Sequence, residues 1–115
     1  MKVTKIPIPI YHGVLQIVIT DSFTEASKKF KIDHNGQDPD SFGAFVNVTT
    51  YGNGLDFFTV FFKPDVSHSL IAHEVVHLVN GLYIERHMEL DKVNDENQAY
   101  ITGWITEQIY KTINK

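Results

Sequence analysis

Hydrophobic and polar residues follow a strand-like period in the first part of this chain and a helical one in the last part. β-Branched and apolar residues fill positions 13–20, which predicts a mostly buried strand. Ser22 and Glu25 have the spacing of a capping box and precede apolar residues at helical intervals, so a short helix is expected at about 22–31. A run of turn-forming residues then predicts a loop at 33–40.

A hairpin is expected next, because two strand-like segments at 44–51 and 55–62 flank the short connection Gly52-Asn53-Gly54. The period then becomes helical over 67–81. The resulting order begins with a strand and a helix and continues with two strands.

Two helices are expected at the end of the chain. The first should stop at Gly81, since glycine commonly ends a helix. The second should run over about 94–113 with Asn94 as its N-cap, after a polar connection at 83–93. The complete order of strand, helix, two strands, helix and helix predicts an α+β fold.

The composition is that of an ordinary globular chain. Its 115 residues are 43% hydrophobic and 21% charged, which argues against intrinsic disorder and fits one domain over residues 1–115. Ten Lys and Arg against 14 Asp and Glu give a formal net charge of −4. We expect no nucleic-acid partner, because no strong positive field exists to attract phosphates.

Membrane and thiol functions are not expected. No stretch approaches the roughly 20 consecutive apolar residues that span a bilayer, and Pro7 and Pro9 help to interrupt the apolar N-terminal segment where an export signal needs an unbroken run. We therefore expect a soluble cytoplasmic protein without a membrane partner. The chain has no cysteine, so any metal site must use histidine and carboxylate ligands.

The segment His73-Glu74-Val75-Val76-His77 is an HExxH motif. Four residues of α-helix rotate by about 400°, so His73 and His77 lie one turn apart on the same face and can both bind one zinc ion. Glu74 is displaced by about 100° from His73, which places its carboxylate beside the metal as a general base. Apolar residues occupy the opposite arc, so the histidines should face away from the core.

A structural interpretation of the motif competes with the metal site. The two imidazoles would then be hydrogen-bonded at the edge of the core, and Glu74 would be a solvated helix carboxylate. Two histidines and a glutamate at this spacing are costly to bury without a ligand, which favours a metal.

A catalytic zinc usually has three protein ligands, so a third must come from elsewhere in the chain. Glu96 follows His77 after 18 residues, where a helical hairpin can return it to the metal. Ala99 and Gly103 lie on nearly the same side and would let the last two helices approach closely. Glu96 could instead complement the helix dipole. The other candidate ligands are Glu85, His87, Glu89, Asp91 and Asp95.

These residues resemble the zinc centre of the gluzincins, a group of zinc peptidases. In one-zinc aminopeptidases of that group, HExxH is followed after 18 residues by a glutamate, and His73, Glu74, His77 and Glu96 match this pattern within residues 55–107. The resemblance implies a minimal zincin-like fold: a small sheet with a β-hairpin, a backing helix, an HExxH active-site helix and a C-terminal glutamate helix.

The resemblance also implies roles for individual residues. His73, His77 and Glu96 would bind one zinc ion, Glu74 would be the general base, and the strand 55–62 would align an extended peptide along its edge. The chain shows no amine-binding motif of an exopeptidase, so aminopeptidase specificity is not carried over. The candidates for stabilising the oxyanion are Tyr83, His87, Tyr100 and Tyr110, but packing against the neighbouring helix is the favoured explanation of the aromatic ones, and none is assigned the role.

The sequence thus predicts a zinc-dependent peptidase that hydrolyses a peptide or protein substrate with water activated by zinc and Glu74. Two other interpretations stay open. The first is a noncatalytic or regulatory zinc-binding protein-interaction module. The second is a metal-free interaction domain in which the hairpin 44–62 exposes an edge. His12, His34 and His68 are expected to be surface or cap residues.

Overall fold

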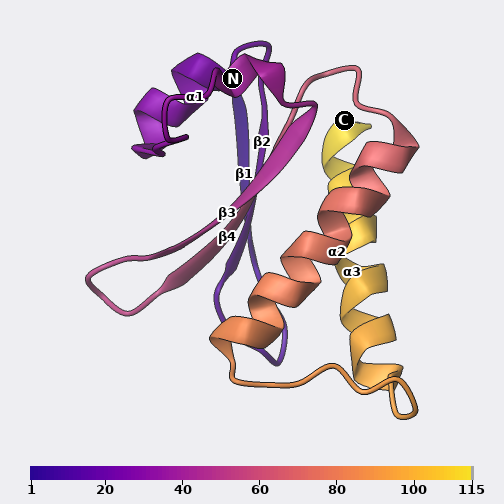
Figure 1. Ribbon diagram of the computed structural model, residues 1–115. Helices are drawn as coiled ribbons and strands as arrows, with labels where there is room; N and C mark the ends of the chain where they lie inside the picture. Colours follow the sequence, from indigo (N-terminus) through magenta and orange to yellow (C-terminus); the bar gives the residue numbers. More distant parts are fainter. Residues whose placement is uncertain (115) are drawn as a thin grey trace.

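The computed structural model describes residues 1–114, which form an α+β arrangement of a four-stranded mixed sheet, three α-helices and one short 3₁₀-helix. The elements are β1 (Lys2–Pro7), β2 (Val14–Ile19), α1 (Phe23–Phe30), the 3₁₀-helix η1 (Pro39–Ser41), β3 (Ala44–Thr50), β4 (Asp56–Phe62), α2 (His68–Glu85) and α3 (Glu96–Ile113). Figure 1 shows α2 and α3 side by side along the sheet and α1 at one end of it. The predicted α+β class is confirmed.

The strands lie in the order β1-β2-β4-β3, with β2 and β4 parallel and the two outer pairs antiparallel. The predicted hairpin is confirmed, since Ala44 of β3 pairs with Phe62 of β4 and the register continues to Thr50 and Asp56. One expectation is wrong. The strand 55–62 was expected to offer its edge to a peptide, but β4 is paired on both sides, and the free edge belongs to β3.

Alternating side chains give the sheet two apolar faces. Leu15 and Phe58 belong to the face that packs against α2 and α3, and Val18 and Phe61 belong to the face that packs against α1. The larger core lies between the sheet and the two long helices. The helical residues in it are Ile71, Val75, Leu78, Val79, Leu82 and Tyr83 of α2 and Ile101, Ile105 and Ile109 of α3. This core fixes one side of α2 and leaves its other side open.

The sequence pattern missed β1. Lys2, Lys5 and Pro7 give this segment little apolar content, and most of its side chains are exposed or half-buried. It nevertheless pairs along its whole length with β2, from Lys2 opposite Ile19 to Pro7 opposite Val14. Lysine and proline are typical of a sheet edge that does not accept another strand, so composition hid a strand that pairing stabilises.

Both long helices begin or end at residues other than those predicted. α2 passes through Gly81 and ends at Glu85. Gly81 lets the helix pack closely against β3, because a Cβ there would lie 3.2 Å from Cγ2 of Val48. α3 begins at Glu96 with Asp95 as N-cap, so the prediction of Asn94 as N-cap is wrong. No helix among residues 1–114 combines the length and apolarity needed to cross a bilayer.

Candidate metal centre

The HExxH segment lies in the middle of α2. The helix starts at Ser67, whose Oγ accepts a hydrogen bond from the amide of Leu70 at 3.2 Å. Its apolar face is buried in the core, and His73 and His77 are exposed on the other side. The prediction that the histidines face away from the core is confirmed.

The two imidazoles lie close enough together to share one ion. Their Nε2 atoms are 3.2 Å apart. Two nitrogen ligands of a tetrahedral zinc, each at 2.0–2.1 Å from the metal, are about 3.3–3.4 Å apart, so the observed spacing fits zinc with little adjustment. One donor atom each from His73, Glu74 and His77 lies within 4.8 Å of the others, and this group can hold a metal ion. The same spacing also permits an N–H···N hydrogen bond between differently protonated imidazoles.

Glu74 is buried, with only 4% of its surface exposed. Its carboxylate accepts no hydrogen bond from any group within residues 1–114. Desolvation raises the pKa of Glu74 above its ordinary value of 4.5, while the nearby His73 and His77 pull it part of the way back. The structure therefore places a carboxylate with a raised proton affinity directly beside two potential metal ligands.

A hollow of about 420 Å³ lies over these three residues. His73, Glu74 and His77 form one wall, and Ala44, Phe45 and Val46 of β3 form the other. The free edge of the sheet therefore runs beside the candidate metal centre. The hollow is open to solvent, which gives an extended ligand access to the histidines.

Glu96 is not part of the group. It is the first residue of α3 and is exposed, and its carboxylate is absent from the donor atoms that lie within 4.8 Å of one another. His68 and Tyr110 are in contact where α2 begins and α3 ends, so the two helices are antiparallel (Figure 1). His77 lies eight residues before the end of α2, about 12 Å along its axis, whereas Glu96 starts α3 beyond the connection.

The predicted contact between the last two helices through small residues is wrong. Ala99 and Gly103 are exposed, and a Cβ added at Gly103 would meet nothing within 4 Å. The isoleucines of α3 pack into the core instead. The other candidate third ligands also lie outside the group of donor atoms: Glu85, His87, Glu89, Asp91 and Asp95.

The candidates for stabilising an oxyanion do not line the hollow. Tyr83 is buried with its ring centroid 6.4 Å from that of Tyr11, and Tyr100 is exposed on α3. Tyr110 contacts His68, and His87 lies in the turn after α2 with a positive φ of 55°. Each of these side chains has a place in the fold that is separate from the histidines.

Sequence reasoning missed that β3 lines the hollow beside the histidines. A signal for it was present in the pattern of the two hairpin strands. β4 reads as a nearly continuous apolar run, typical of an interior strand, whereas β3 alternates Val46, Asn47, Val48 and Thr49 as a half-covered edge strand does. Comparing the two strands would have placed the free edge correctly.

No protein-family model, curated protein or solved structure with which the chain was compared matches it.

Proposed function

We propose that this protein is a zinc-dependent peptidase whose centre is the HExxH segment of α2. The observation that supports this most strongly is the position of two imidazole nitrogens 3.2 Å apart beside the carboxylate of Glu74, which lines the same hollow. His73 and His77 would hold the metal. Zinc, when bound, would polarise the scissile carbonyl and lower the pKa of a water molecule.

Glu74 is the general base in this proposal. Its carboxylate takes a proton from the attacking water, whose oxygen bonds to the carbonyl carbon of the peptide. Glu74 then gives that proton to the leaving amine nitrogen as the C–N bond breaks. The position of Glu74 supports both steps, because its carboxylate lines the same hollow as the two imidazoles that would hold the metal.

The substrate would bind as an additional strand along β3. This strand offers seven residues without a single charge or proline, whereas β1 at the opposite edge carries two lysines and a proline. An uncharged edge strand accepts the backbone of an extended peptide through main-chain hydrogen bonds. A peptide held on β3 would pass over the hollow that contains His73 and His77.

We keep Glu96 as the third ligand in this proposal. Two arguments support it: the spacing of 18 residues after His77, and the need for Glu74 to stay off the metal if it is to act as a base. Ligation by Glu96 requires the first turn of α3 to approach His77. Replacing Glu96 by Ala should then weaken zinc binding, and replacing the neighbouring Asp95 by Ala should not. Equal zinc affinity in both variants would exclude Glu96 as the third ligand.

A noncatalytic zinc-binding module is the second candidate function. It is favoured by the lining of the hollow, whose six residues include no hydroxyl group or cationic side chain to stabilise an oxyanion. In that case the metal would hold a partner protein without cleaving it.

One experiment separates these functions. The metal content of the purified chain is measured by plasma mass spectrometry, and the chain is then incubated with a mixture of tryptic peptides whose new ends are identified by mass spectrometry. We expect about one zinc per chain and new peptide ends that disappear in Glu74→Gln. Zinc without new ends in the wild type supports the binding module, and the absence of tightly held metal contradicts both functions.

A further inference from the structure

The open side of α2 continues past the histidines as one stripe. His73, His77, Asn80 and Ile84 follow one another at intervals of four, three and four residues, which keeps them on one face of the helix. Ile84 is 71% exposed, so a large aliphatic side chain is open to solvent near the end of α2. The stripe therefore begins with two potential metal ligands, His73 and His77, and ends with an apolar side chain, Ile84.

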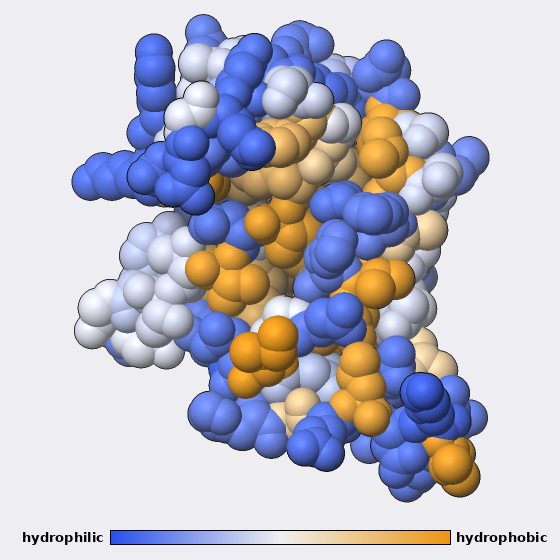
Figure 2. Space-filling model, viewed as in Figure 1, coloured by the Kyte–Doolittle hydropathy of each residue, from blue (hydrophilic) through white to orange (hydrophobic). Residues whose placement is uncertain are grey.

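A second hollow of about 240 Å³ opens beside the end of this stripe. It is lined by Asn80, Tyr83, Ile84, Met88 and Leu90. Apart from the amide of Asn80 and the phenol of Tyr83, its lining is aliphatic. Pockets for whole small molecules usually measure about 300–1,000 Å³, so this hollow suits a single large side chain better than a complete ligand. Figure 2 shows apolar side chains gathered over the lower end of α2, between polar ones.

β3 runs beside the stripe in the same direction as α2. Two glycines mark the contacts: a Cβ on Gly43 would lie 3.2 Å from Leu70, and a Cβ on Gly81 would lie 3.2 Å from Val48. Five strand residues and eleven helix residues separate these contacts, and both span about 16–17 Å. The far end of β3 is therefore level with the end of the stripe at Ile84.

We propose that the hollow beside Ile84 binds an apolar side chain of the peptide substrate, three or four residues to the N-terminal side of the cleaved bond. This proposal rests on the peptidase function proposed above. Ile84 follows His77 by seven residues, about 10 Å of helix, which three residues of extended peptide span. We take the peptide to pair antiparallel to β3, as β4 does on the other side of that strand. Such a peptide runs from the level of Ile84 towards that of His73, which puts the hollow on the N-terminal side of the cleaved bond.

The cleavage arm of the test aligns the peptides that the zinc-loaded wild type cuts in a tryptic digest. We expect Leu, Ile, Phe or Met to be enriched about tenfold at the third or fourth residue before the cut, the scale for one side chain in an apolar pocket. Ile84→Ser should abolish this enrichment. Val93→Ser should keep it, because Val93 is 94% exposed but does not line the hollow. Enrichment that is absent, or unchanged in Ile84→Ser, overturns the proposal.

The binding arm does not require turnover. The zinc-loaded Glu74→Gln variant is titrated into two fluorescein-labelled decapeptides, one of alanine and serine with a single central leucine and one with serine in place of that leucine. Fluorescence anisotropy should show about tenfold tighter binding of the leucine peptide, lost when Ile84→Ser is added and kept with Val93→Ser. If this preference appears while the wild type cuts nothing, the apolar site stands and the peptidase function fails. Equal affinity for both peptides overturns the apolar site.

Discussion

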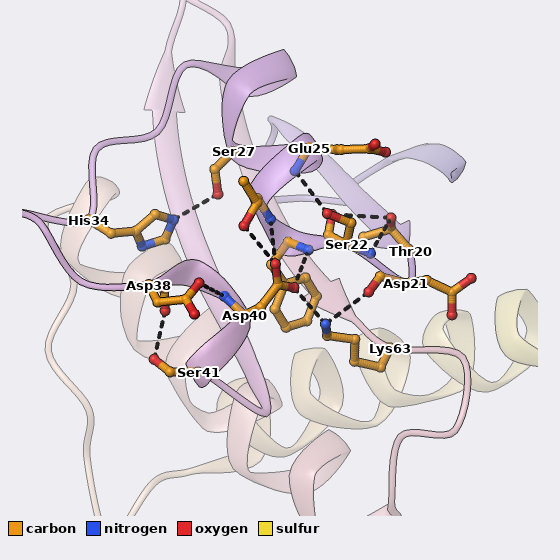
Figure 3. Close-up of polar contacts among 12 residues, drawn as sticks. Thr20, Asp21, Ser22, Glu25, Ser27, His34, Asp38, Asp40, Ser41 and Lys63 are labelled. Atoms are coloured by element: carbon orange, nitrogen blue, oxygen red, sulfur yellow. Dashed lines mark hydrogen bonds and ion pairs between the residues drawn. The ribbon is translucent and has the colours of Figure 1, made fainter.

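Two carboxylates, Asp40 and Glu74, are held in opposite ways in this molecule. Asp40 joins the 3₁₀-helix to the start of α1: its Oδ1 accepts from the amide of Phe23 and from Nζ of Lys63, both at 2.7 Å, and its Oδ2 accepts from the amide and hydroxyl of Thr24 (Figure 3). Lys63, Thr24 and Phe23 together hold the pKa of Asp40 well below its ordinary range. Glu74 is more buried, has no donor among residues 1–114, and has a raised pKa.

The difference indicates what each carboxylate does. A carboxylate whose oxygens are all satisfied by its own chain ties elements together, as Asp40 does for α1, η1 and the residue after β4. The carboxylate of Glu74 is not engaged by any group of residues 1–114 and lines a hollow that is open to solvent, which leaves it available to a ligand from outside. The neighbouring imidazoles of His73 and His77 are the groups with which Glu74 can act on such a ligand.

The comparison is tested most strongly by removing each charge in turn. Glu74→Gln should lower the kcat of peptide hydrolysis by about 10²–10⁴-fold, the usual contribution of a general base, while zinc content stays near that of the wild type. Asp40→Asn is the matched control and should leave kcat unchanged within about twofold when assayed well below its unfolding temperature. Similar losses in both variants would refute the distinction between the two carboxylates.

The second prediction compares a histidine of the candidate metal centre with a histidine near Asp40. His77→Ala should weaken zinc binding by at least about 100-fold, since groups that merely orient metal ligands already contribute 10–100-fold. His34→Ala is the control, because His34 bonds to the hydroxyl of Ser27 at 2.8 Å (Figure 3) and does not belong to the group of donor atoms around His77. Competition with a chromogenic zinc chelator measures both affinities. An unchanged affinity in His77→Ala would exclude it as a ligand.

The third prediction concerns stability, for which Asp40 is the residue that matters and no longer the control. Asp40→Asn should lower the Tm of the metal-free protein by several degrees at pH 7, because it removes the ion pair with Lys63 and weakens the acceptor at the start of α1. Differential scanning calorimetry in the presence of a chelator measures this. A Tm equal to that of the wild type would mean that the contacts of Asp40 do not stabilise the fold.

The smallest expected effect is a difference in pH dependence. Asp40 has a lowered pKa in the folded state, so its contribution is complete above its ordinary value of 3.8 and is lost as the pH falls through and below that value. Glu74 has a raised pKa, so in the metal-free protein its cost is present at neutral pH, shrinks as the pH falls through the raised value, and is gone below its ordinary value of 4.5.

Chemical denaturation of the metal-free variants between pH 3 and pH 7 should show these opposite trends. Glu74→Gln should be slightly more stable than the wild type at pH 7, with a difference that vanishes in acid. Asp40→Asn should be less stable at pH 7, and its deficit should shrink in acid. Parallel pH profiles for the two variants would contradict the assignment of Glu74 as a desolvated carboxylate.

Local patterns in the sequence predicted the parts of this fold that depend on local interactions. The N-cap at Ser22, the hairpin and the exposed position of the two histidines all follow from short-range spacing. β1 could not be found in this way, because pairing with β2 stabilises a segment whose own composition is polar. The end of α2 was misplaced for a similar reason, since only contact with Val48 explains a glycine inside the helix.

The same distinction between local and long-range interactions applies to the candidate site. Helical periodicity was sufficient to bring His73, Glu74 and His77 together, because all three lie on one helix. The position of Glu96 depends on the length of α2 and the course of the connection, neither of which spacing determines. The wall formed by β3 depends on strand order, which is a property of the whole sheet.

The central claim is that His73 and His77 bind one metal ion while Glu74 stays beside it. The X-ray absorption spectrum of the zinc-loaded protein tests this most directly, because it reports the ligands of the ion itself. We predict two imidazole nitrogens at about 2.0–2.1 Å, reduced to one in His77→Ala, with a first shell that is unchanged in Glu74→Gln. A spectrum without imidazole scattering, or one that loses an oxygen ligand in Glu74→Gln, would contradict the account.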